Sequence, residues 1–253
     1  MPADPSKPTS TPSLMGQAVA MRALFDEWRP LVVAEAGHFV GDGIVMEEAW
    51  QASRRRILFL LKEPHGYKGA DGGMDKLIRD AAKPRSTSKL WRRPTFHNLG
   101  RWAHGLLSYE GAVPDFADAH RARRTAMLGC AFVNLKKTSG GRSATSEVDV
   151  HAQRYAEFLR RQVDIIEPDL VVMGGTYPTV KEHLYPGLEK VSSRVHKLGN
   201  RLFINAFHPA CTNERLEVYH QVLFSYHQHV SGIAAIAAMP GPVSMDCKAG
   251  LAD

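Results

Sequence analysis

Four short apolar runs alternate with longer, helix-like stretches along the chain, and this alternation restricts the fold more than any other feature. The runs are residues 57–61 (ILFLL), 130–135 (CAFVNL), 169–174 (DLVVMG) and 201–207 (RLFINAF). Short runs that are apolar throughout are typical of strands buried on both faces. Strands that alternate with helices predict an α/β fold of three layers, with helices on both faces of a central four-stranded, mainly parallel sheet.

The stretches around these runs have the apolar spacing of amphipathic helices. The predicted helices cover residues 16–32, 96–107, 115–128, 146–166 and 213–230. A chain of 253 residues, of which 44% are hydrophobic, can bury one sizeable core, so a single domain is expected.

The two ends of the chain differ in composition from the middle. Residues 1–13 are rich in Pro, Ser and Thr and predict a disordered leader, whereas residues 233–253 are rich in small side chains and predict a flexible tail. The single domain is therefore expected over residues 14–232.

Charge and cysteine content narrow the class of protein. The balance of 32 Lys and Arg against 26 Asp and Glu gives a net charge of +6, which suits a polyanionic partner but also occurs in proteins that never bind nucleic acid. Three scattered cysteines without a CxxC pair predict neither a disulfide framework nor a metal site. No stretch has the length of a membrane span and no signal peptide is evident, so we expect a cytoplasmic monomer that does not contact membranes.

Polar side chains of catalytic type follow three of the four apolar runs. Glu63 lies two residues after the first run, Asn134 is the last polar residue of the second, and His208 follows the fourth. The carboxyl ends of parallel strands meet at one edge of a sheet, where ligands bind in open α/β folds, so these side chains are expected to converge. They are candidates for catalysis, although each also fits a structural role as a cap, a turn residue or a satisfied core residue.

In this arrangement the chain resembles the uracil-DNA glycosylase superfamily. One signature of that family is a strand followed by Gly-Gln-Asp-Pro-Tyr or Gly-Glu-Ala-Pro-Gly, and another is a strand followed by His-Pro-Ser. Residues 61–65 (LKEPH) align with the first signature, and residues 207–212 (FHPACT) align with the second. Between them, residues 132–142 (FVNLKKTSGGR) resemble the family's Thr-Asn-Val-Val-Lys segment, and residues 167–180 (EPDLVVMGGTYPTV) resemble its third strand and glycine turn. The ordered resemblance implies the same fold over roughly residues 50–230.

Three departures distinguish the chain from the usual family pattern. Leu61 stands in place of the glycine that opens the first loop, and Ala210 stands in place of the serine after His-Pro. The four cysteines of the iron–sulfur branches are also missing. The resemblance therefore implies a divergent member without an iron–sulfur cluster, for which we expect no cofactor and no metal ion.

The resemblance implies an enzyme that flips a pyrimidine out of DNA and hydrolyses its N-glycosidic bond, leaving an abasic site. This reaction builds positive charge on the sugar and negative charge on the leaving base. Glu63 aligns with the water-activating aspartate of the family, so it is expected to position water and offset the charge of the sugar. His208 is expected to donate a hydrogen bond to the base oxygen that gains charge, and Asn134 is expected to bind the edge of the flipped base.

Further contacts with DNA are expected around these residues. Trp91 lies closest to the position of the family's stacking aromatic, with Tyr67 and Phe96 as alternatives, and a core role suits each of the three as well. Loops rich in basic and small residues bind phosphates but are often merely solvated. The residues predicted to bind DNA in such loops are Lys62, Lys136, Lys137 and Arg142.

The base that is excised depends on His65. Uracil-specific members carry a tyrosine there that excludes a substituent on carbon 5, so the smaller His65 followed by Gly66 would admit 5-modified pyrimidines. Such an enzyme would suit defence against phages with modified DNA, whereas a His65 that itself blocks carbon 5 would suit uracil repair in single- or double-stranded DNA. The alternative to a glycosylase is a non-catalytic nucleic-acid-binding module or a nucleotide-processing enzyme on the same fold.

Overall fold

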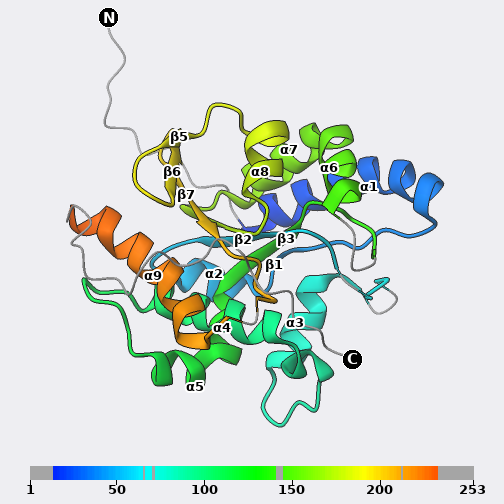
Figure 1. Ribbon diagram of the computed structural model, residues 1–253. Coiled ribbons are helices and arrows are strands. Elements are labelled where there is room, and N and C mark those ends of the chain that lie inside the picture. The colour runs from blue at the N-terminus through cyan, green and yellow to red at the C-terminus, as the bar shows by residue number, and fades with distance from the viewer. Residues whose placement is uncertain (1–13, 65, 70–71, 141–144, 212, 233–253) are drawn as a thin grey trace, which may run out of the picture.

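The computed structural model describes residues 14–64, 66–69, 72–140, 145–211 and 213–232. In this part of the chain, seven strands form one mixed sheet in the order β1-β3-β2-β4-β7-β6-β5, and helices cover both of its faces (Figure 1). The strands are β1 (Gly43–Ile44), β2 (Ile57–Leu61), β3 (Cys130–Asn134), β4 (Leu170–Gly174), β5 (Glu189–Lys190), β6 (Val195–Leu198) and β7 (Arg201–Ala206). The helices are α1 (Leu14–Ala36), α2 (Glu47–Ala52), α3 (Met74–Ala82), α4 (Pro94–Leu107), α5 (Phe116–Ala126), α6 (Thr145–Arg154), α7 (Ala156–Ile166), α8 (Tyr177–Thr179) and α9 (Arg215–Ser231).

The four central strands are parallel to one another. β2 pairs with β3 on one side and with β4 on the other, and β4 pairs with β7. The register sets Leu61 beside Asn134 and Gly174 beside Ala206, so the carboxyl ends of all four strands lie at one edge of the sheet. The outer strands β1, β5 and β6 are antiparallel to their neighbours.

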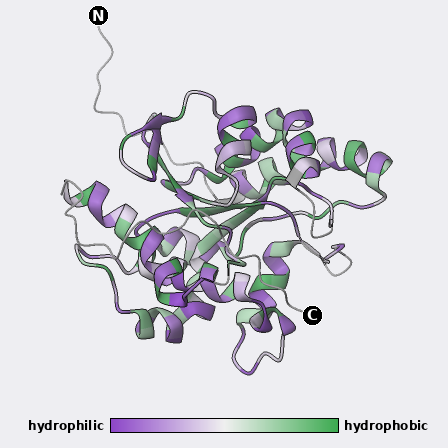
Figure 2. Ribbon diagram, viewed as in Figure 1, coloured by the Kyte–Doolittle hydropathy of each residue, from purple (hydrophilic) through white to green (hydrophobic). Residues whose placement is uncertain are grey.

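Alternate side chains of the central strands enter two separate apolar clusters, because successive residues of a strand face opposite sides of the sheet. Ile57 and Phe59 of β2 join the cluster covered by α3, α4, α5 and α9. Leu58 and Leu60 join the cluster covered by α1, α6 and α7. Figure 2 shows the central strands hydrophobic along their length, which fits burial on both faces.

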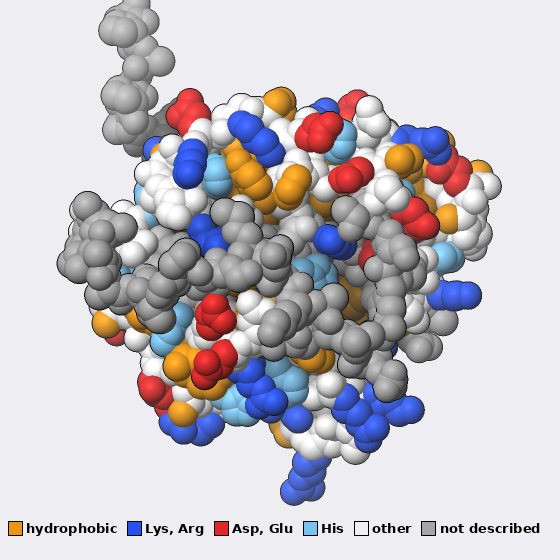
Figure 3. Space-filling view, viewed as in Figure 1, with side chains coloured by type: hydrophobic (Ala, Val, Ile, Leu, Met, Phe, Trp, Pro, Cys, Tyr) orange, Lys and Arg blue, Asp and Glu red, His pale blue; other side chains and the backbone are white. Residues whose placement is uncertain are grey.

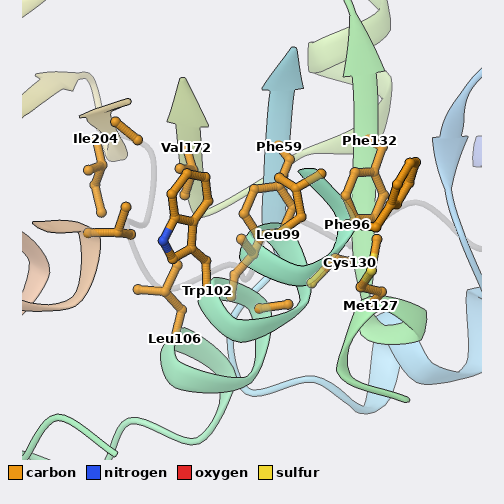
Figure 4. Packing of buried hydrophobic residues seen from close by; sticks show 14 of the residues in the cluster. Phe59, Phe96, Leu99, Trp102, Leu106, Met127, Cys130, Phe132, Val172 and Ile204 are labelled. Atoms are coloured by element: carbon orange, nitrogen blue, oxygen red, sulfur yellow. The ribbon is translucent and has the colours of Figure 1, made fainter. Parts of the chain in front are cut away.

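Helix α4 fills the middle of the first cluster. Trp102 and Leu106 of α4 are fully buried and lie against the sheet beside Phe59, Val172 and Ile204 (Figure 4). Full burial of an aromatic or aliphatic side chain contributes about 1.5–3 kcal/mol relative to exposure. This packing fixes α4 under the sheet and, with it, the polar residues that α4 presents to the carboxyl edge.

The sequence prediction for the central strands is confirmed to within one residue at either end, since the four apolar runs are β2, β3, β4 and β7. The expected size of the sheet is wrong, because β1, β5 and β6 extend it from four strands to seven. The helix predicted over residues 146–166 is interrupted at Tyr155, which separates α6 from α7. Helices α2 and α3 were not predicted.

The predicted leader and tail, residues 1–13 and 233–253, lie outside the described residues. Within the described ranges, no helix combines the length and the hydropathy that crossing a membrane requires.

Candidate active site

The direction of the strand order reverses between β2 and β4. From β2 the chain continues to β3 on one side, whereas from β4 it continues to β5, β6 and β7 on the other side. The loops after β2 and β4 therefore leave in opposite directions, and ligands of open α/β sheets bind where this happens. Glu63 follows β2 at this point, and His208 follows β7 on the far side of β4.

Two glycines at the end of β4 allow the neighbouring strand ends to pack closely. A Cβ on Gly174 would lie 2.9 Å from Leu61 Cδ2 and 3.0 Å from Pro209 Cδ, so the end of β2 and the turn after β7 both lie against this residue. Gly175 has φ +71°, and a Cβ there would lie 2.9 Å from His208 Cβ. The missing side chains thus allow the end of β2 and the His208 turn to pack closely against the end of β4.

His208 is held as a neutral imidazole with a defined tautomer. The backbone N–H of Ala210 donates to His208 Nδ1 at 3.2 Å, so the ring proton resides on Nε2. Burial, together with the positive charge of Lys62, lowers the pKa of His208 to about 4. At neutral pH the residue is therefore an uncharged donor through Nε2.

Glu63 is a buried carboxylate beside a buried ammonium group. Its Oε2 lies 3.5 Å from Lys136 Nζ, and the two side chains are only 7% and 11% exposed. Lys136 also forms an ion pair with Glu147 at the start of α6. A Cβ on Gly140 would lie 2.1 Å from Glu63 Oε2 and 2.7 Å from Lys136 Nζ, so the backbone after β3 packs directly on this pair.

Asn134 is fixed by a second buried network beneath the edge. Its backbone N–H and its Nδ2 both donate to Asp42 Oδ2, at 2.8 and 3.1 Å. Asp42 Oδ1 accepts from Lys137 Nζ at 2.6 Å and from Gln162 Nε2 at 2.9 Å. Asn134 is only 2% exposed, and Oδ1 is the side-chain atom that these hydrogen bonds do not use.

The structure corrects the expectation for Lys137. Its side chain and that of its partner Asp42 are 0% exposed, and the ammonium group lies 5.2 Å from the centre of the Trp28 ring. A phosphate cannot reach this group, so Lys137 is a structural residue. Lys136 likewise faces Glu63 and Glu147 rather than an open surface.

Of the three aromatic residues predicted as candidates for stacking, two lie in the core and Tyr67 does not. Trp91 is 7% exposed, belongs to the cluster under the sheet, and donates from Nε1 to the Ala81 carbonyl at 2.8 Å. Phe96 is buried in the same cluster. Tyr67 is only partly buried and its hydroxyl donates to the Gly72 carbonyl at 2.7 Å, which leaves its ring as the better candidate for stacking.

Two predicted site residues, His65 and Arg142, lie outside the described residues. Lys62 is half-buried next to Glu63; its carbonyl accepts from the backbone N–H of Lys136 at 2.9 Å, and its charge acts on His208. The structure therefore brings Lys62, Glu63 and Lys136 into one group at the edge.

Sequence reasoning missed three residues that shape the site. Asp42 precedes the first predicted strand, and nothing in its neighbourhood pointed to a role beneath Asn134. Glu147 was assigned only to a helix. Gly140 had a recognisable signal, because the paired glycines of the SGGR segment indicate a close backbone approach.

A cavity of about 380 Å³ lies beside the candidate site. Lys136, Thr138 and Glu147 contribute to its wall, but neither Glu63 nor His208 does. We assign the site from its chemistry and place in the sheet rather than from this cavity. In the described part of the chain, no three His, Cys, Asp or Glu side chains are grouped as metal ligands.

No family model matches the chain, and no curated protein is significantly similar to it.

Proposed function

We propose that the protein is a monofunctional DNA glycosylase on a uracil-DNA glycosylase-like fold. It would hydrolyse the N-glycosidic bond of uracil or a 5-modified pyrimidine and leave an abasic site. The observation that carries this proposal is the pairing of a buried carboxylate, Glu63, with a neutral imidazole, His208, on either side of the β4 glycines. These two groups match the two charges that develop when the bond breaks.

His208 would stabilise the leaving base. Negative charge gathers on a carbonyl oxygen of the pyrimidine as the bond breaks, and a donor fixed in advance stabilises that charge without reorganising. The hydrogen bond from Ala210 to Nδ1 supports this role because it keeps the proton on Nε2. A neutral donor suffices, in agreement with the low pKa of His208.

Glu63 would act on the sugar and on the attacking water. An ionised carboxylate stabilises the positive charge of the sugar and can accept a proton from water. Lys136 supports the ionised form, because a positive charge 3.5 Å from Oε2 favours a negative one. Asn134 Oδ1 would bind the edge of the flipped base, and Tyr67 would stack on its face.

One observation favours the nucleotide-processing alternative. Lys136 and Lys137, two of the four basic residues predicted to bind phosphates, form ion pairs within the protein instead. A smaller substrate such as a free nucleotide would need fewer phosphate contacts while the same Glu63 and His208 cleaved the same type of bond.

An excision assay distinguishes a DNA glycosylase from a nucleotide-processing enzyme. Single- and double-stranded oligonucleotides containing uracil are incubated with the protein, and abasic sites are scored by alkaline strand cleavage; free deoxyuridine and its phosphates are assayed in parallel by chromatography. The proposal expects abasic sites in DNA. Release of base from free nucleotides alone would favour the alternative, and no release from any uracil or 5-modified substrate would contradict both.

The same assay shows which bases the protein excises. Uracil, 5-hydroxymethylpyrimidines and glycosylated pyrimidines are compared for the wild-type protein and for His65→Tyr. If His65 leaves carbon 5 open, the tyrosine should abolish excision of the larger bases and spare uracil. If the wild-type protein excises only uracil and the variant behaves identically, the open pocket is wrong.

A further inference from the structure

Arginines and histidines gather where α4 and α5 meet, and one of them, Arg101, is buried. Arg101 is 3% exposed, and its Nη1 donates to Asn98 Oδ1 and its Nη2 to His120 Nδ1, both at 2.9 Å. On the neighbouring turn, Arg123 Nε donates to His97 Nδ1 at 2.9 Å. The two imidazole rings stack with their centroids 6.0 Å apart. With Arg215 at the start of α9, we call this group the arginine–histidine cluster; its members are His97, Arg101, His120, Arg123 and Arg215.

The cluster carries positive charge without a negative partner. No ion pair among the described residues includes Arg101, Arg123 or Arg215. Burial, together with the charges of Arg215 and Arg123, lowers the pKa of Arg101 to about 10. Burial and the same arginines lower the pKa of His120 to about 4, so the imidazole is a neutral acceptor.

Repulsion among these positive charges destabilises the cluster, and a bound anion would offset that repulsion. Buried charges that repel one another cost free energy unless an opposite charge compensates them. Guanidinium groups bind phosphate oxygens with paired, charge-assisted hydrogen bonds. Arg215 is exposed, and its side chain makes no hydrogen bond with a described residue. Arg123 is half-buried; its Nε donates to His97 and its Nη1 to the His120 carbonyl, which leaves Nη2 to donate to a ligand.

Asn98 connects the cluster to the candidate active site. Its Oδ1 accepts from Arg101, while its Nδ2 donates to the Pro209 carbonyl at 2.9 Å. Pro209 follows His208 directly, and Arg215 begins the helix after the same turn. A group bound by the arginines would therefore lie next to the turn that holds the imidazole.

We propose that the arginine–histidine cluster binds a phosphodiester group of the DNA strand. Arg123 and Arg215 contact the phosphate oxygens, and Arg101 supplies positive charge behind them. The choice of DNA as the source of the phosphate rests on the proposed function; the presence of an anion site does not. Figure 3 shows basic and His side chains side by side on the open surface over the α4 and α5 region, where a polymer can approach.

The test measures binding of unmodified duplex and single-stranded DNA, because phosphate contacts do not depend on the base. Fluorescence anisotropy over a range of salt concentrations compares the wild-type protein with Arg123→Ala, Arg215→Ala and the double variant. We expect a loss of affinity of roughly tenfold for each arginine. The slope of log affinity against log salt should fall by about one for each lost phosphate contact.

Arg121→Ala is the matched control. Arg121 lies on α5 between two residues of the cluster, but it is exposed and pairs with Asp118. It should bind DNA like the wild-type protein. Equal effects of Arg121→Ala and the double variant would overturn the proposal, because a diffuse positive surface would then explain the binding.

A second measurement distinguishes the source of the anion. Inorganic phosphate is compared with chloride at equal ionic strength for its effect on the melting temperature, since a ligand that binds the folded state stabilises it. Stabilisation that needs Arg123 and Arg215, together with weaker DNA binding in the variants, supports the proposal. Stabilisation by phosphate without any change in DNA affinity would show a site for a small anion and overturn the phosphodiester assignment. If only the proposed glycosylase function is wrong, DNA binding would still depend on Arg123 and Arg215, but no base would be released.

Discussion

Glu63 Oε2 and Lys136 Nζ lie 3.5 Å apart at the carboxyl edge of the sheet, with both side chains almost excluded from solvent. The carboxylate comes from the loop after β2 and the ammonium group from the loop after β3. Pairing across neighbouring strands fixes the position of a side chain that would otherwise sample several rotamers. Lys136 therefore holds in place the Glu63 carboxylate that we propose as catalytic.

Replacing either proposed catalytic group should reduce excision much more than DNA binding. Glu63→Gln keeps the size of the side chain and removes its negative charge, whereas His208→Asn shortens the side chain and removes the fixed Nε2 donor. Their interactions grow in the transition state, so we expect kcat to fall by roughly ten- to a thousandfold with little change in Kd for DNA. Single-turnover excision and anisotropy measure the two quantities. Parallel losses of binding and turnover would contradict the assigned roles.

Gly140→Ala should disturb the Glu63–Lys136 pair. The new methyl group would overlap Glu63 Oε2, which must then move away from Lys136. Because the displaced atoms end flexible side chains, we expect a stability change within about 1 kcal/mol but a loss of excision of tenfold or more. Gly187→Ala is the control, since its nearest neighbour would lie 3.7 Å away in ordinary contact. A variant with unchanged excision would show that the position of Glu63 is not critical.

Lys137→Met should destabilise the fold without changing the salt dependence of DNA binding. Removing the ammonium group leaves the Asp42 carboxylate buried without its charged partner, which costs about 3 to 5 kcal/mol. Chemical denaturation compares this variant with Lys197→Met, which changes an exposed lysine on β6. A shallower salt slope for folded Lys137→Met would mean that this lysine does contact phosphate.

Stability should fall as the pH is lowered from neutrality. Burial, together with the charges of Lys137 and Lys136, lowers the pKa of His151 from an ordinary value of 6.5 to about 3. Below pH 6.5 the unfolded chain takes up a proton that the folded chain refuses until about pH 3, so stability is lost across this window as the pH falls. The loss amounts to about 1.4 kcal/mol per pH unit for one such group.

His151→Gln tests this explanation. The amide oxygen can still accept from the Lys137 backbone N–H, which His151 Nε2 binds at 3.2 Å, but it does not titrate. Free energies of unfolding between pH 4 and 7 should depend less steeply on pH in this variant than in the wild-type protein. His229→Gln, at the end of α9, should leave the slope unchanged. Identical slopes for all three proteins would rule out His151 as a source of acid sensitivity.

The central strands were predictable because burial on both faces leaves a strong sequence signal, an unbroken apolar run bounded by turn residues. β1 and β5 leave no such signal, since two residues are too few to show a period. The placement of Glu63, Asn134 and His208 at the carboxyl edge was also predictable. Each lies at or just after the end of a predicted parallel strand, and such ends meet at one edge of a sheet.

The partners of those residues were not predictable. Lys136 and Lys137 are adjacent in a basic, glycine-rich segment that is typical of a phosphate-binding loop. In the fold they face opposite sides of the chain, one toward Glu63 and the other toward Asp42. Both carboxylates come from distant parts of the sequence, and contacts of that kind depend on the tertiary structure rather than on local pattern.

The short outer strands have a consequence for behaviour at high concentration. A sheet with a long unpaired border can add strands from another molecule and grow into an aggregate. Here one border is the two-residue β1, and the other is β5, whose two residues are the charged Glu189 and Lys190. Another molecule could form few hydrogen bonds at either border, and at one of them it would meet charged side chains. Both features disfavour edge-to-edge polymerisation of this sheet.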